Sequence, residues 1–133
     1  MPHLQPPAVS WDGTTVDATP TDLFLDESGV ERFDLPDHST HAFEILVVAR
    51  DVATDASASW RAEGAVKRGV GAASVAFVGS VSVTLIGRDL PAFALARFDV
   101  VADILTGALT LRVTGAVGTT IDWQAIGRLV RSV

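Results

Sequence analysis

Apolar and polar residues alternate with a period of two along much of this chain, which is the pattern of a β-strand with one buried face. Residues 40–50 place one set of alternating side chains on a single face, namely His41, Phe43, Ile45, Val47 and Ala49. Residues 57–67 alternate more strictly, with Trp60 on the inward face and Arg61 and Glu63 on the outward face. Both segments are predicted to be strands.

Shorter alternating or β-branched runs fill the rest of the chain, at residues 74–78, 81–86, 94–103, 108–114 and 120–130. Gly79 and Ser80 are expected to form a tight hairpin. Residues 23–25 and 30–33 are expected to pair across a polar turn. A helix at 91–104 is the competing interpretation, but the charges at 97, 99 and 103 fall on alternate positions. Seven to nine short strands predict an antiparallel β-sandwich or barrel.

The N-terminal residues 1–22 differ from the rest, because they hold four of the six prolines and show no clear alternation. We interpret them as an extended arm, followed by a sandwich domain at 23–133. Trp11 lies in this arm, away from any periodic run, and is therefore the best candidate for contact with another subunit or ligand. Pro6 and Pro7 are candidate contacts for the same reason. Trp60 and Trp123 share their phase with apolar neighbours and are expected in the core.

Composition supports one folded domain with apolar surface to spare. The 133 residues are 48% hydrophobic, with a mean hydropathy of +0.36, so a substantial core can form and the excess is expected to meet a partner. No apolar run is long enough for a transmembrane helix, and the N-terminus lacks the pattern of a secretory signal. Cysteine is absent, which excludes disulfides and thiolate chemistry.

The net charge of −6 disfavours nucleic acid as a partner, since phosphate binding depends on Lys and Arg. The charge is uneven: residues 1–56 sum to −9 and residues 57–133 to +3. This asymmetry either orders neighbouring subunits or simply reflects acidic, solvated loops.

Candidate chemistry is sparse. Ser, His and Asp are present, but no nucleophile motif ties them together, and no enzymatic activity or cofactor is expected. His38 and His41 lie near Asp34 and Asp37, and such groups could gather around a metal on the axis of a symmetric trimer. Their spacing matches no standard site, so His38 and His41 are weak metal candidates and the metal expectation is none.

Three stretches, residues 59–68, 83–87 and 109–125, carry a resemblance to known proteins. The shared order of elements is a strand, a Thr-Gly turn and a closing Ile-x-Trp-x-Ala strand at 121–125. Over roughly residues 40–130 the chain resembles β-sandwich modules of tail-fibre, head-fibre and spike proteins of tailed bacteriophages and gene transfer agents. The resemblance implies a jelly-roll-like, homotrimeric, non-enzymatic structural protein of the virion. It also implies contact with host-surface glycan or protein, and the arm would attach the domain to other virion proteins.

Two other classes stay open. One is a free carbohydrate-binding or lectin-like module, which would need aromatic and Asp platforms on a concave face. The other is a small jelly-roll hydrolase or isomerase, which would need a His-rich metal set. Neither nucleic acid binding nor membrane insertion is expected in any of these cases.

Overall fold

The computed structural model describes residues 8–25 and 29–132, and it is built of antiparallel strands with one short 3-10 turn at Ala72–Ser74. The ten strands are β1 (Ala8–Thr15), β2 (Thr21–Leu25), β3 (Phe33–Asp34), β4 (Ser39–Asp51), β5 (Ser57–Arg68), β6 (Ala76–Phe77), β7 (Ser82–Arg88), β8 (Arg97–Asp103), β9 (Ala108–Thr114) and β10 (Ile121–Ser132). The predicted antiparallel, all-β, sandwich-like class is thus confirmed. Within the described residues, no helix is long and apolar enough to span a bilayer.

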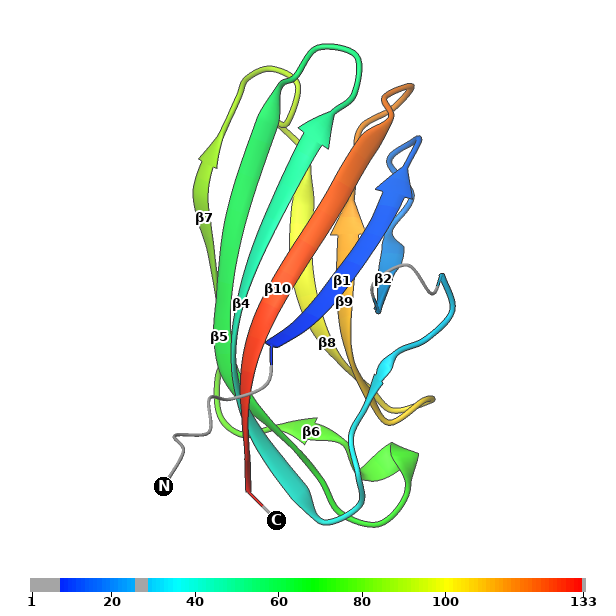
Figure 1. Cartoon of the computed structure of the whole chain (residues 1–133), viewed down its shortest axis with the longest axis vertical. Helices are drawn as coiled ribbons and strands as arrows, with labels where there is room; N and C mark the ends of the chain where they lie inside the picture. Colours follow the sequence, from blue (N-terminus) through cyan, green and yellow to red (C-terminus); the bar gives the residue numbers. More distant parts are fainter. Residues whose placement is uncertain (1–7, 26–28, 133) are drawn as a thin grey trace.

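The strands form one sheet that curls into two layers (Figure 1). The front layer runs β1, β10, β4, β5, with β6 and β7 both paired to β5. In the back layer β9 pairs with β8 on one side and with β2 and β3 on the other. β2 joins the layers, because Thr21–Leu23 pair with β9 while Phe24 and Leu25 pair with β1.

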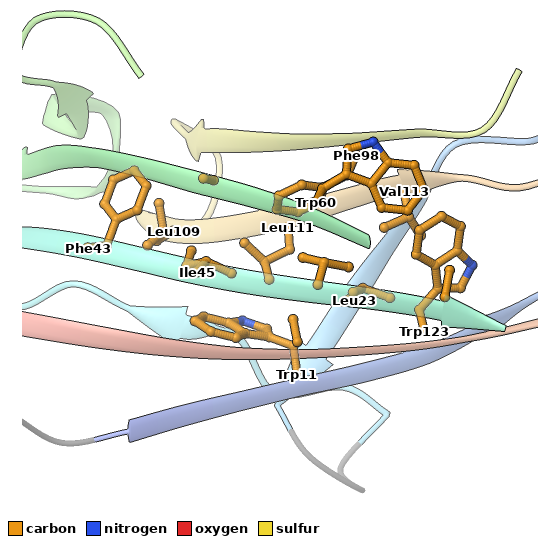
Figure 2. Close-up of a cluster of buried hydrophobic side chains, with 14 of the residues drawn as sticks. Trp11, Leu23, Phe43, Ile45, Trp60, Phe98, Leu109, Leu111, Val113 and Trp123 are labelled. Carbon is orange, nitrogen blue, oxygen red and sulfur yellow. The ribbon is translucent and has the colours of Figure 1, made fainter. Parts of the chain in front are cut away.

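The inner faces of the two layers enclose the core (Figure 2). The front layer contributes aromatic and β-branched side chains from the alternate positions of its strands, including Trp11, Ile45, Val47, Trp60 and Trp123. The back layer contributes Leu23, Phe98, Leu109, Leu111 and Val113. The strict burial alternation of β4 and β10 confirms the period-two prediction for both segments.

The predicted N-terminal arm is wrong from residue 8 onward. β1 pairs with β10 along its whole length, from Ala8 opposite Arg128 to Thr15 opposite Ile121. The described part of the sandwich therefore begins at Ala8 instead of residue 23. The sequence does not show a clear alternation here, because two of the inward positions of β1 are occupied by Gly13 and by Thr15, a polar residue.

Two local pairings also differ from the prediction. β6 and β7 do not form a hairpin with each other around Gly79, because each of them pairs with β5. β7 has a bulge opposite Ser59 and Trp60. β3 pairs with β9 instead of β2, although the Leu25 amide donates to the Glu31 carbonyl at 2.8 Å. The alternative helix at 91–104 does not form, because the segment turns and then enters β8.

Candidate functional site

The two candidate metal ligands lie in different environments. His41 points inward from β4, is 4% exposed, and packs edge-to-face on Phe33 with ring centroids 5.7 Å apart. His38 is exposed in the preceding turn, with a φ of 58°. Among residues 8–25 and 29–132, no group of three His, Cys, Asp or Glu side chains is arranged to hold a metal ion. The His38 and His41 metal site is therefore not assembled within the described chain.

The buried imidazole of His41 has an unusual environment. Its Nδ1 is buried and finds no hydrogen-bond partner among the described residues. Burial lowers the pKa of His41, and the positive charge of Arg131, its neighbour on β10, lowers it further. The folded protein therefore favours the neutral imidazole, which suits an aromatic packing role.

Trp11 is a core residue, which corrects its assignment as a partner contact. Its side chain is 1% exposed and packs edge-to-face against Phe33 at 6.4 Å. Gly127 on β10 leaves room for the ring, since an added Cβ there would lie 3.0 Å from Trp11 Cζ3. Pro6 and Pro7, the other two candidate contacts, lie outside the described residues.

The other two tryptophans close one end of the core, as expected from their phase. Trp60 and Trp123 stack with ring centroids 5.5 Å apart (Figure 2). The Trp123 indole Nε1 donates to Thr15 Oγ1 at 2.9 Å, so its polar atom is satisfied inside the protein. All three indoles are thus buried, and none offers a surface on which a sugar ring could stack.

An ion cluster that the sequence did not reveal ties β2 to β9 and to the segment before β3. Asp22 accepts from Arg112 Nε at 2.8 Å and from Arg32 Nη1 at 3.0 Å. The Asp22 hydrogen bond is the main cause that raises the pKa of Arg112. The Arg32 guanidinium also lies 4.8 Å from the centre of the Phe24 ring. Each charge has a partner, so the cluster acts as a structural clamp.

The most distinctive surface is the outward side of the two central front strands. We define the β4–β10 face as the outward residues of β4 from Ala42 to Arg50 and of β10 from Asp122 to Val130. Its large aliphatic side chains are 42–58% exposed: Leu46, Val48, Ile126 and Val130. Ser10 and Gln124 join three of these residues in lining a shallow depression of about 440 Å³.

Charged residues border the apolar centre of this face at both ends. In the register of β4 and β10, Glu44 lies opposite Arg128 and Arg50 lies opposite Asp122. Arg61 on β5 lies 3.5 Å from the Glu44 carboxylate. Arg50 forms an ion pair with Asp55, and Asp122 accepts from Thr14 Oγ1 at 3.0 Å. The sequence carries a signal for this exposed apolar face, because positions 46, 48, 126 and 130 are apolar although the alternation points their side chains outward.

Strand β7 forms a second exposed region at the end of the front layer (Figure 1). All seven of its residues are exposed, including Val83, Leu85 and Ile86. A depression of about 500 Å³ lies between β4 and β7, with Val48 and Ile86 among its lining residues. Apolar surface therefore continues from the β4–β10 face toward this edge.

No family model matches the chain, and no curated protein matches it.

Proposed function

We propose that the protein is a non-enzymatic structural subunit of a phage-type particle, in a fibre, spike or head-decoration position, which assembles with copies of itself. The observation that carries self-assembly is the exposed aliphatic surface of the β4–β10 face. Clustered aliphatic side chains on an outward sheet face are costly in water unless another surface covers them. The particle context comes from the resemblance of residues 59–68, 83–87 and 109–125 to fibre and spike modules.

The nature of the surface favours assembly over recognition of free sugars. Carbohydrate platforms depend on exposed aromatic rings, whereas Trp11, Trp60 and Trp123 are all buried and the chain has no tyrosine. Host-surface glycan or protein contact therefore stays a secondary part of the proposal, to be sought on the assembled particle. The resemblance implies three copies in the assembly. A ring of three joins two different patches, so a three-fold contact and the two-fold contact proposed in the next subsection are alternatives that the mass of the isolated chain distinguishes.

The experiment that tests the proposed function is detection of the chain in particles purified from its source on a density gradient. We expect it to co-sediment with particle proteins and to be labelled by antibody at the particle surface in electron micrographs. Presence only in the unassembled soluble fraction would overturn the structural role. A glycan array on the isolated protein tests the carbohydrate-binding alternative, for which no binding is expected.

A further inference from the structure

The β4–β10 face has a pattern that bears on which partner covers it. Across the register of the two strands, most outward positions face a residue of like polarity or of opposite charge. Ile126 lies opposite Leu46 and Val130 opposite Ala42, so apolar meets apolar. Arg128 lies opposite Glu44 and Asp122 opposite Arg50, so each charge meets its opposite. Only Gln124 opposite Val48 departs from this rule.

This pattern has a consequence for two copies of the chain. A two-fold axis lying along the strands, between β4 and β10, places β4 of one copy over β10 of the other. Each residue then faces the residue that already lies opposite it within its own sheet. Glu44 faces the second copy's Arg128, Ile126 faces its Leu46, and Arg50 faces its Asp122. The face is therefore complementary to itself about this axis.

We propose that the β4–β10 face is the contact by which two copies of this chain pair about a two-fold axis parallel to the strands. The occupant is a second copy, because the apolar and charged positions of one face match those of an identical face. The neighbouring strands introduce no conflict: Asp12 on β1 faces Ser59 on β5, and Ser10 faces Arg61. No like charges meet across these contacts.

A two-fold axis perpendicular to the strands is a competing arrangement, since it would place Glu44 over Arg50 and Arg128 over Asp122. Each axis leaves one apolar side chain over Gln124, namely Val48 for the parallel axis and Ile126 for the perpendicular axis, but only the parallel axis places Val130 over Ala42. Both axes leave the strands of the two copies aligned, as in sandwiches, so the matching of side chains is what separates them. The two arrangements predict different behaviour of charge variants.

The size of the face sets the expected strength of pairing. With the flanking strands β1 and β5 included, the contact area comprises four strands spaced about 4.8 Å apart. Over about eight residues of about 3.4 Å each, these strands span about 500 Å² per copy. Two copies then cover about 1,000 Å², which is near the lower limit for a specific interface. We therefore expect a dimer with a dissociation constant in the micromolar range.

The first measurement is the mass of the isolated full chain by sedimentation over a range of concentrations. We expect about twice the 14.0 kDa of one chain near 100 µM, with dissociation on dilution. A monomer at every concentration overturns the proposal. A trimer also overturns it, because a closed three-fold ring joins two different patches instead of one patch with itself.

The decisive measurement uses Glu44→Arg and Arg128→Glu, prepared as separate proteins. Each variant alone places like charges across the two-fold contact, so the dissociation constant should rise at least about tenfold. An equimolar mixture restores opposite charges at both contacts between the copies, so a heterodimer should form. Within each variant copy, positions 44 and 128 carry like charges before and after mixing. Dimer formation by the mixture therefore reports the contact between copies only.

Failure of the mixture to restore pairing overturns the proposed axis. It is the result expected for the perpendicular arrangement, where the arginine introduced at position 44 would meet Arg50. Ile126→Asp, at the centre of the face, should also abolish the dimer, while Leu105→Asp, on a residue 87% exposed in the β8–β9 turn, should not. Circular dichroism of every variant verifies the fold.

The proposed dimer shares only self-assembly with the proposed function. The dimer and the particle role can therefore fail separately. Absence of the chain from particles would overturn the particle role and leave the dimer intact. A monomer in solution would overturn the dimer and leave particle incorporation untouched.

Discussion

At the scale of single residues, Trp11 is a buried core side chain, although the sequence pattern suggests a partner contact. The indole lies between β1 and the back layer, and it occupies the space that Gly127 leaves by lacking a side chain. The same missing Cβ would lie 3.1 Å from Ile45 Cγ1. A side chain at position 127 would therefore require Trp11 and Ile45 to shift by a few tenths of an ångström.

Trp11→Ala is expected to destabilise the protein by about 3–5 kcal/mol, because it removes a fully buried indole and leaves a cavity. Gly127→Ala is expected to destabilise by about 1–3 kcal/mol through overpacking against the same ring. Chemical denaturation followed by tryptophan fluorescence measures both. The exposed Leu105→Ala control should change stability by less than about 0.5 kcal/mol. A Trp11→Ala protein as stable as the control would refute the buried placement.

His41 predicts a pH dependence of stability. Its folded pKa is lowered from 6.5 by burial and by Arg131, so below pH 6.5 the unfolded chain binds a proton that the folded chain resists. The free energy of unfolding should therefore be constant above about pH 7 and fall between about pH 6.5 and 5, by at most about 1.4 kcal/mol per pH unit. Urea denaturation across this range measures it.

The control for this prediction separates the buried imidazole from the exposed one. His41→Leu should flatten the pH dependence between about pH 7 and 5, whereas His38→Asn should leave it in place. Asn is the suitable replacement at position 38, because it tolerates a positive φ. An unchanged profile in His41→Leu would contradict the assignment.

At the scale of strands, the joint between the layers depends on β2, which pairs with β1 at one end and with β9 at the other. Asp22 lies at this joint and holds Arg32 and Arg112 by direct ion pairs. Its side chain is 19% exposed, so the pairs are partly shielded from solvent. The cluster therefore fixes β2 to β9 where the sheet changes layer.

Asp22→Ala is expected to lower the free energy of unfolding by about 1–2 kcal/mol, since two guanidinium groups lose their shared acceptor. Glu63→Ala on β5 is the matched control, because its carboxylate lies 3.2 Å from Arg61 Nε and its side chain is 53% exposed. The control should cost less than about 0.5 kcal/mol. Equal losses in the two variants would show that the cluster contributes nothing particular to the joint.

At the scale of the whole molecule, the strands with strict alternation were predictable and the pairing between distant strands was not. β4 and β5 were predictable because apolar side chains such as Phe43, Ile45 and Trp60 fill the central inward positions of the two strands. β1 could not, because Gly13 and Thr15 occupy inward positions and a run of prolines precedes it. Burial of Trp11 depends on β10, more than a hundred residues away, and no local pattern reports such a contact.

The placement of β1 makes truncation the sharpest test of the whole architecture. β1 lies between β2 and β10, so its removal would expose the β10 edge, detach β2 from the front layer and remove Trp11 from the core. We expect a chain lacking residues 2–15 to lose cooperative thermal unfolding, as measured by circular dichroism. A chain lacking only residues 2–7 keeps the complete β1 ladder from Ala8 onward and should unfold cooperatively. Cooperative unfolding of the longer deletion would mean that residues 8–15 are a dispensable arm.

The shorter deletion also removes Pro6 and Pro7, so it tests their proposed attachment role in a folded protein. We expect this deletion to abolish incorporation into particles.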